Sequence, residues 1–176
     1  MAETRVWVHG IAVEARFPLA FPESLSLQER TEAGAFFSTS GSVVSHSFYL
    51  SFPSPTILND FSMRLRRVFI RYETNGATIK RVRIFDGPTL VADFPNLIGW
   101  SGNHNNGFDA SNQLIFSPQS ISNSILIVVE VDFDGPSFNK TIRFSSAGIQ
   151  LFTDELLRPI IRLIMRFFER LFEPRP

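Results

Sequence analysis

The sequence contains no cysteine in its 176 residues. Disulfide frameworks, cysteine-based zinc sites and thiolate nucleophiles are therefore excluded. Long apolar runs are missing as well, because even the apolar stretch near the C-terminus carries an arginine in nearly every helical turn. A membrane-spanning helix needs about twenty predominantly apolar residues, so we expect no such helix.

An excess of charge of either sign is also missing, since 17 Lys and Arg residues balance 17 Asp and Glu residues. The whole molecule therefore has no net field that would attract a nucleic acid, and we expect no nucleic-acid partner. Residues Met1 to Arg5 lead directly into a strand-like segment and show no apolar signal-peptide region. The localisation expected by default is the cytoplasm.

Residue patterns typical of catalysis are equally scarce. The histidines, His9, His46 and His104, have no metal-ligand spacing with one another. No nucleophile elbow, phosphate-binding loop or dinucleotide fingerprint occurs, and the acidic residues are scattered over turns. We therefore predict a protein that is not an enzyme and that uses neither a metal ion nor a cofactor.

Residues 3 to 148 have the pattern of β-strands, with short runs rich in Phe, Val, Ile and Thr between Gly, Pro, Asn and Asp. Segment 44–52 alternates large apolar residues with Ser and Tyr, as a strand with one buried face does. Segment 124–133 contains a continuous apolar run, which indicates a central strand covered on both faces. We predict an all-β domain over residues 1–150, an antiparallel β-sandwich or jelly roll of about seven to nine strands.

A tight turn is predicted at Asn75 and Gly76, a dipeptide that readily adopts the positive φ angles such turns require. The turn lies between the strand-like segments 64–73 and 78–86. These residues therefore predict a β-hairpin.

The predicted hairpin is locally basic. Glu73 is its one acid before the second segment ends, against seven basic residues: Arg64, Arg66, Arg67, Arg71, Lys80, Arg81 and Arg83. One interpretation is an anion-binding face, and the other is a solvated ladder of charge pairs with Glu130, Asp132 and Asp134 on another strand. We favour the ladder, since sheets that bind nucleic acid usually add exposed aromatic residues for stacking.

A long polar stretch, residues 99–112, interrupts the strand pattern. Loops of this length inside compact domains are often functional. The stretch combines an aromatic side chain with planar amides, as the rim of a sugar-binding site does, and its candidate ligand contacts are Trp100, Asn103, His104 and Asp109. A carbohydrate-binding module is therefore one functional hypothesis.

The pattern changes after Gly148 to that of one C-terminal amphipathic α-helix, expected over residues 151–176. Thr153 is the expected N-cap, and Pro174 ends the helix. One face carries four arginines, Arg158, Arg162, Arg166 and Arg170. Large apolar residues occupy the remaining arc of roughly 200°. Among them the expected interface residues are Leu157, Ile160, Ile161, Ile164, Phe167, Phe168, Leu171 and Phe172.

An apolar arc of this width has to be covered, and three ways are open. The helix can pair with copies of itself, lie on its own sandwich, or lie in a lipid interface with its arginines at anionic headgroups. We favour the first, which makes the chain a non-enzymatic structural protein that self-associates as a homo-oligomer. Peripheral binding to an anionic membrane surface and carbohydrate binding by the loop 99–112 are the alternatives.

Six segments, in this order, resemble those of a known family: RVFIRY at 67–72, IFDGP at 84–88, SGNH at 101–104, LIF at 114–116, VEVDF at 129–133 and IRFSSAG at 142–148. The family is one of uncharacterised bacterial β-sandwich proteins, and the resemblance covers about residues 40–150. It implies a β-sandwich fold, with the C-terminal helix as an extension of the usual family domain. It implies no activity and no site residue, because the family has none assigned.

Overall fold

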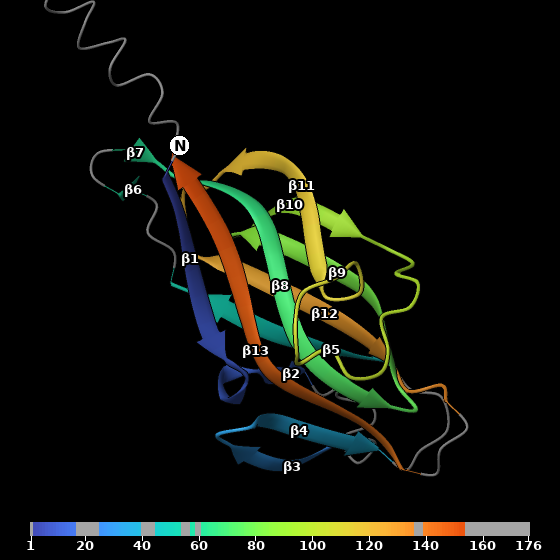
Figure 1. The fold of residues 1–176 in the computed structure, drawn as a ribbon. Coiled ribbons are helices and arrows are strands. Elements are labelled where there is room, and N and C mark those ends of the chain that lie inside the picture. Colours follow the sequence, from blue (N-terminus) through green and yellow to red (C-terminus); the bar gives the residue numbers. More distant parts are fainter. Residues whose placement is uncertain are drawn as a thin grey trace, which may run out of the picture.

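The computed structural model describes residues 2–16, 25–39, 45–53, 57–58, 61–135 and 139–153. These residues form thirteen β-strands and one short 3-10 helix (Figure 1). In chain order the elements are β1 (Ala2–His9), η1 (Gly10–Ala12), β2 (Glu14–Arg16), β3 (Ser26–Thr31), β4 (Gly34–Thr39), β5 (Ser45–Phe52), β6 (Ile57–Leu58), β7 (Phe61–Ser62), β8 (Arg64–Asn75), β9 (Thr78–Asp86), β10 (Thr89–Phe94), β11 (Gln113–Ser120), β12 (Ile125–Asp132) and β13 (Lys140–Thr153).

Eleven of these strands form two antiparallel sheets that face each other, as the β-sandwich prediction required (Figure 1). The first sheet has the order β11-β8-β13-β4-β3, and β1 also pairs with β13. The second sheet has the order β10-β9-β12-β5-β2, and the short strands β6 and β7 pair separately. The predicted count of seven to nine strands was too low, because short edge strands such as β2 leave little pattern in the sequence.

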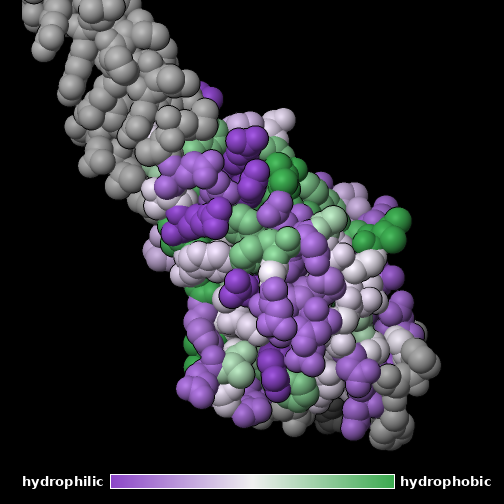
Figure 2. Space-filling model, viewed as in Figure 1, coloured by the Kyte–Doolittle hydropathy of each residue, from purple (hydrophilic) through white to green (hydrophobic). Residues whose placement is uncertain are grey.

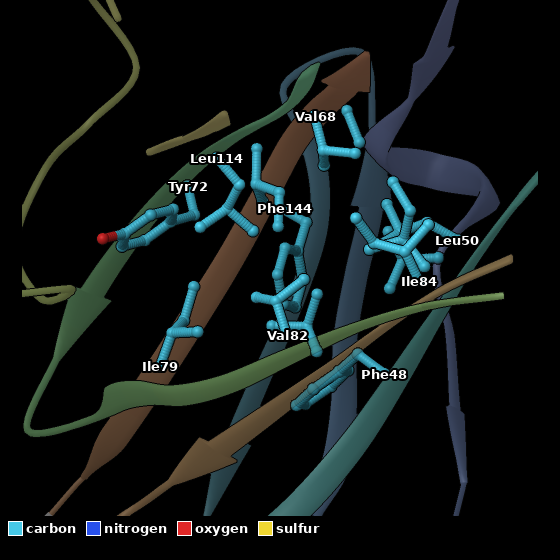
Figure 3. Close-up of a cluster of buried hydrophobic side chains, with 14 of the residues drawn as sticks. Phe48, Leu50, Val68, Tyr72, Ile79, Val82, Ile84, Leu114 and Phe144 are labelled. Atoms are coloured by element: carbon cyan, nitrogen blue, oxygen red, sulfur yellow. The ribbon is translucent and has the colours of Figure 1, made fainter. Parts of the chain in front are cut away.

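The core lies between the inner faces of the two sheets (Figure 3). Phe48 and Leu50 project from β5, and Phe144 projects towards them from β13 on the opposite sheet. The rings of Phe48 and Phe144 lie 5.0 Å apart between centroids. Burying such a side chain contributes about 1.5–3 kcal/mol, so this layer supplies most of the driving force for the sandwich.

The burial pattern confirms one strand prediction in full and a second in part. In β5 every second residue is buried, from His46 through Phe48 and Leu50 to Phe52. In β12, which lies between β9 and β5, Val128 is buried on the face opposite to that of Ile127 and Val129. The prediction of a central strand is therefore confirmed, but coverage on both faces is not, because Leu126 and Glu130 lie on the same outer face as Val128 and are only half-buried.

The predicted β-hairpin is wrong, because β8 and β9 belong to different sheets. Gly76 does adopt a positive φ of 63°, but the turn carries the chain from one sheet to the other. The crossing is short, since two residues separate β8 from β9, and the Gly135 amide donates a hydrogen bond to the Gly76 carbonyl at 3.1 Å. In this arrangement Tyr72 of β8 and Ile79 of β9 both point into the core (Figure 3). The apolar surface that they bury favours two facing sheets over a hairpin in which β8 and β9 pair.

The predicted fold class also needs correction, because the described part of the chain contains no α-helix. Residues 151–153, expected to begin a C-terminal helix, continue strand β13, and Thr153 pairs with Ala2 of β1. Leu151 is fully buried in the core, and β13 pairs here with β1 on one side and β8 on the other, so burial and backbone pairing together favour a strand over a helical turn. The fold of the described residues is an all-β sandwich of two antiparallel sheets.

Candidate functional site

The outer face of the first sheet carries an unusual set of side chains, which we call the Trp7 face. Its members are Arg5 and Trp7 of β1, Arg67, Phe69 and Arg71 of β8, Gln150 of β13, and Phe108 of the loop between β10 and β11. In β1 the inward residues Val6 and Val8 pack against the core, so the alternation of the strand turns Arg5 and Trp7 outwards. Figure 2 shows this side of the molecule as a hydrophilic surface interrupted by a small hydrophobic patch over β8.

The indole of Trp7 lies flat across the neighbouring strand because that strand has a glycine there. The register places Trp7, Gly148 and Phe69 in one row across β1, β13 and β8. A Cβ atom on Gly148 would lie 2.7 Å from Cε3 of Trp7, closer than two carbons can come. The ring of Trp7 therefore spans Gly148 and stacks on Phe69, with 5.7 Å between centroids, while 41% of Trp7 stays exposed.

The loop between β10 and β11 adds Phe108 to this row. Its ring lies 4.7 Å from that of Phe69 and 5.6 Å from that of Trp7, measured between centroids. The guanidinium of Arg71 lies 4.8 Å from the Phe108 ring centroid and 5.6 Å from that of Trp7. Phe69 is thereby sealed at 2% exposure, and Trp7 becomes the aromatic ring that this face presents to solvent.

A second row carries polar groups beside the aromatic one. The register aligns Arg5, Gln150 and Arg67 across the same three strands. The guanidinium of Arg5 lies 5.7 Å from the ring centroid of Phe69, which is two strands away, so this side chain crosses β13. Gln150 is buried at 2% exposure, and its Oε1 atom has no hydrogen-bond partner among the described residues.

The arginines of the Trp7 face are not neutralised. No carboxylate of the described residues forms an ion pair with Arg5, Arg67 or Arg71. The Nε atoms of Arg67 and Arg71 are buried and lack a hydrogen-bond partner within the described ranges. Buried polar atoms are nearly always hydrogen-bonded in folded proteins. Nε of Arg83 on the second sheet is unpartnered as well, so the feature that sets the Trp7 face apart is that its three arginines lack a carboxylate partner among the described residues.

The basic residues of β9 behave differently and lie on the outer face of the second sheet. Arg81 contacts Asp93 at 2.6 Å, Lys80 contacts Asp134 at 3.7 Å, and Arg83 pairs with Glu130. The hydrogen bond from Arg81 is the main reason that the pKa of Asp93 lies below its ordinary value. The predicted ladder of charge pairs is confirmed in part: Glu130 and Asp134 do pair with basic residues of β9, but the partner of Arg81 is Asp93, which was not predicted. Of the arginines in β8, the other half of the predicted basic hairpin, Arg67 and Arg71 lie on the Trp7 face.

Trp100, expected to offer an exposed platform, is 2% exposed. Its Nε1 donates a hydrogen bond to the carbonyl of Ala110 at 3.0 Å, and its ring stacks on Tyr72 with 6.1 Å between centroids. The Tyr72 hydroxyl in turn donates to the carbonyl of Ser111 at 2.8 Å. Burial, and then the charge of Asp109, raise the pKa of Tyr72. Trp100 therefore fixes the loop to the core by its buried side chain.

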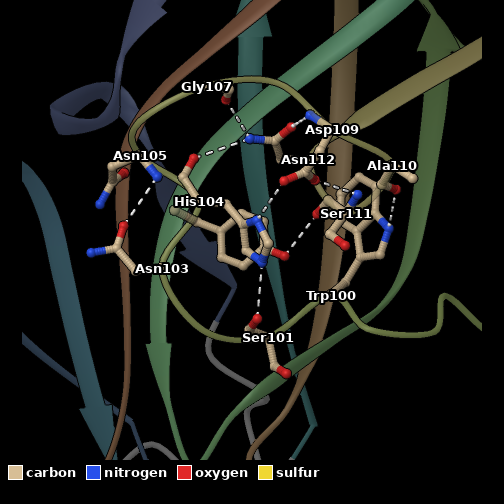
Figure 4. Close-up of polar contacts among 11 residues, drawn as sticks. Trp100, Ser101, Asn103, His104, Asn105, Gly107, Asp109, Ala110, Ser111 and Asn112 are labelled. Atoms are coloured by element: carbon tan, nitrogen blue, oxygen red, sulfur yellow. Dashed lines mark hydrogen bonds and ion pairs between the residues drawn. The ribbon is translucent and has the colours of Figure 1, made fainter.

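The other predicted loop residues hold the loop together (Figure 4). Nδ1 of His104 lies 3.4 Å from a carboxylate oxygen of Asp109, and Nε2 of His104 lies 3.0 Å from the carbonyl of Ser101. The side chain of Asn103 accepts a hydrogen bond from the amide of Asn105 at 3.1 Å. These contacts shape the segment that places Phe108 over the first sheet.

Asn112 contributes most to the loop, and the sequence analysis missed it. Its Nδ2 donates to the carbonyls of His104 and Gly107 at 3.1 and 2.7 Å, and its Oδ1 accepts from the amide of Asp109 at 2.8 Å. Because Asn112 is buried, these three bonds fix the backbone on both sides of Phe108.

The remaining histidines have structural environments. The side chain of His9 accepts a hydrogen bond from the Ile11 amide and so caps the 3-10 helix. His46 is buried against Phe133, and burial lowers its pKa. Among the described residues no three His, Asp or Glu side chains gather into a group that could hold a metal ion.

The interface predictions concern residues 154–176, which lie outside the described residues. They are Leu157, Ile160, Ile161, Ile164, Phe167, Phe168, Leu171 and Phe172, with the arginines Arg158, Arg162, Arg166 and Arg170. The predicted homo-oligomer and the predicted anionic membrane surface both depend on them and stay predictions. Within the described ranges no helix is long and apolar enough to cross a membrane.

The sequence analysis also missed the Trp7 face itself. A local signal was present, since Arg5, Trp7 and His9 alternate with Val6 and Val8 as in a strand with one exposed face. Nothing local indicated that this strand lies beside Gly148 or that Phe108 comes from residues distant in the chain.

Comparison with known proteins identifies no relative that informs this site. No protein-family model matches the chain, and no curated protein matches it. Among solved structures the chain is similar to the insecticidal crystal protein Cry2Aa, with 9% identity and a TM-score of 0.43. The match covers 85% of this chain and 21% of that protein's chain. This likeness is too distant to indicate a function. The resemblance to uncharacterised bacterial β-sandwich proteins stays a prediction.

Proposed function

We propose that the chain is a non-catalytic binding module that holds a carbohydrate on the Trp7 face. The observation that carries this proposal is the ring of Trp7, which lies flat over Gly148 and is 41% exposed on an open sheet face. A flat, exposed indole is amphipathic: its ring faces pack against the C–H groups of a sugar, and its N–H can bond to a hydroxyl. The polar side chains beside it supply the convergent groups that fix the orientation of a ligand.

The chemistry of the face favours binding over catalysis. Its polar groups are the guanidiniums of Arg5, Arg67 and Arg71 and the carboxamide of Gln150. A guanidinium keeps its proton at all ordinary pH values, and a carboxamide does not titrate, so these groups donate and accept hydrogen bonds without transferring protons. Polar groups of this kind support the carbohydrate-binding hypothesis drawn from the loop 99–112, but the aromatic ring on which the sugar stacks is Trp7 in place of Trp100.

The test is a binding screen of the intact chain on an oligosaccharide array, followed by calorimetric titration of the strongest binder. We expect Trp7→Ala to weaken binding at least about tenfold and Trp7→Phe to weaken it less, because a smaller ring keeps part of the stacking surface. The matched control is Leu90→Ala on β10, since Leu90 is a large exposed side chain outside the face.

Thermal unfolding of each variant separates lost binding from lost folding. Absence of binding to every oligosaccharide, or equal affinity of a folded Trp7→Ala variant and the unmodified chain, would contradict the proposal.

A further inference from the structure

The Trp7 face buries polar atoms that have no partner. Within the described residues nothing donates a hydrogen bond to Oε1 of Gln150, and nothing accepts one from the Nε groups of Arg67 and Arg71; outside this face, Nε of Arg83 is also unpartnered. A buried polar atom without a partner destabilises the fold, so such atoms mark places where another molecule can complete the hydrogen bonding. The two Nε–H groups each lack a hydrogen-bond acceptor, and Oε1 of Gln150 lacks a donor.

One exposed side chain crosses the strand that carries Gln150. Arg5 extends from β1 towards Phe69 on β8, and it has to cross β13 between Gly148 and Gln150 to do so. Contacts of a cation with an aromatic ring at an exposed site are weak, and the arginine side chain has many rotamers. Movement of Arg5 would open access to Gln150 while leaving its guanidinium within reach of a ligand.

The charge of the face selects an anion. Arg5, Arg67 and Arg71 have no acidic partner within the described residues, in contrast to the paired basic residues of β9. A guanidinium presents its donors as a planar fork that matches the two oxygens of a carboxylate. The acceptor that the unpartnered Nε group of Arg67 lacks is therefore best supplied by a carboxylate.

We propose that the carbohydrate bound on the Trp7 face is a uronic acid, with its ring on Trp7, its carboxylate at Arg5 and Arg67, and a hydroxyl donated to Oε1 of Gln150. This inference rests on the proposed function and names its ligand class. A uronic acid carries an anionic acceptor and hydroxyl donors on one ring, which matches the two kinds of unpartnered atom.

A nucleic acid fits the same face less well. Single-stranded nucleic acids stack successive bases on several exposed rings, whereas Phe69 is sealed and Trp7 is the large aromatic ring exposed on the described part of this face. The chain also has no net positive charge to attract a polyanion over distance.

The closing experiment compares matched ligands. Oligomers of galacturonic and of glucuronic acid are titrated calorimetrically, each beside its methyl ester, which keeps the sugar ring and removes the charge. We expect at least one acid form to bind at least about tenfold more tightly than its ester, and the difference to shrink at about 1 M salt, where charges are screened beyond about 3 Å.

Two variants test the named contacts. Arg67→Lys keeps the charge and loses the fork, so it should weaken binding of the acid form and leave the ester unaffected. Gln150→Leu removes the unpartnered oxygen, so it should weaken sugar binding while the free protein is as stable as before or more stable. A merely structural role of Gln150 would not give that combination. Arg83→Gln, on the opposite outer face, is the control and should change neither affinity.

The outcomes distinguish the two proposals. Equal binding of acid and ester forms overturns the uronic-acid inference and leaves carbohydrate binding standing. Absence of binding to every sugar overturns both. Submicromolar binding of an oligothymidylate that is lost in Trp7→Ala assigns the face to nucleic acid and also overturns both.

Discussion

The arginines of β9 and those of β8 on the Trp7 face lie on opposite outer faces of the sandwich and make different contacts. On the second sheet Arg81 and Arg83 each lie beside an acid of a neighbouring strand, Asp93 and Glu130. On the first sheet Arg71 lies over the rings of Trp7 and Phe108 and forms no ion pair with a described residue, although Arg143 of β13 does pair with Glu73 at 3.9 Å on the same sheet. The difference shows that the residue on the neighbouring strand, and not the arginine itself, decides whether a guanidinium is used in an ion pair within the protein or is available to a ligand.

The neighbours differ because the central strands differ. In the second sheet β12 presents Glu130 next to the arginines of β9, and β10 presents Asp93 from the other side. In the first sheet β13 presents Gly148 and Gln150, one without a side chain and one without a charge. An ion pair uses the guanidinium donors, whereas an aromatic ring contacts the flat face of the guanidinium and leaves its edge donors available.

A side chain added at Gly148, beneath the indole of Trp7, should disrupt the packing of the Trp7 face more than any other change considered. Gly148→Val places a side chain where Cε3 of Trp7 lies 2.7 Å from the added Cβ, so the ring has to lift and expose Phe69. We expect the free energy of unfolding to fall by about 1–3 kcal/mol, as for other overpacked sites. Denaturant titration measures this, and acrylamide quenching of tryptophan fluorescence reports the lifted ring. The control Ser51→Val, on an exposed position of β5, should change stability by less than about 0.5 kcal/mol.

A carboxylate introduced on β13 should give the arginines of the Trp7 face an acidic partner on a neighbouring strand, as the arginines of β9 have on the second sheet. Gln150→Glu puts an acid between Arg5 and Arg67, which the register places on either side of it. We expect binding of a uronic acid to fall at least about tenfold, because the arginines acquire an internal partner. Calorimetric titration checks the affinity. Unchanged affinity in this variant would show that these two arginines do not contact the ligand.

Removing an acid from the second sheet should have a smaller effect. Glu130→Gln breaks the pair with Arg83, in which both side chains are about 30% exposed. Exposed pairs of this kind contribute about 0.2–1 kcal/mol, so the free energy of unfolding should fall by less than about 1 kcal/mol. Sugar affinity should not change. A large loss of affinity here would mean that the binding site is not confined to the first sheet.

The smallest expected effect concerns acid titration of the second sheet. The pKa of Asp93 is lowered in the folded protein, mainly by the hydrogen bond from Arg81. Its stabilising contribution is therefore present above the ordinary pKa of 3.8 and is lost as the pH falls through the lowered folded value. Carboxyl-carbon NMR should show Asp93 titrating below 3.8, and Arg81→Gln should return the pKa towards that value. An unchanged titration in the variant would rule out Arg81 as the cause.

Local patterns were sufficient to predict strands and some of their burial. The alternation in β5 and the continuous apolar run in β12 each depend on which side chains of one strand face the core. That information lies within a few neighbouring residues, so it can be read before any partner strand is known.

The loop 99–112 shows the limit of such patterns. Its position as a long polar connection was predictable, and its residues do lie near the site. The roles of those residues were not, since Trp100 and Asn112 contact backbone groups that only the folded loop brings together. An indole or an amide looks the same in the sequence whether it binds a ligand or its own loop.

The sequence by itself determined that this chain forms β-strands with one apolar face, because the period of a strand is a property of consecutive residues. Only the tertiary structure decided which strands are neighbours. It placed β8 and β9 in different sheets despite Asn75 and Gly76, and it extended β13 to Thr153 because β1 offered a partner. It also brought Trp7 over Gly148. These outcomes follow from burying apolar surface and pairing backbone groups between residues far apart in the chain, which no local pattern records.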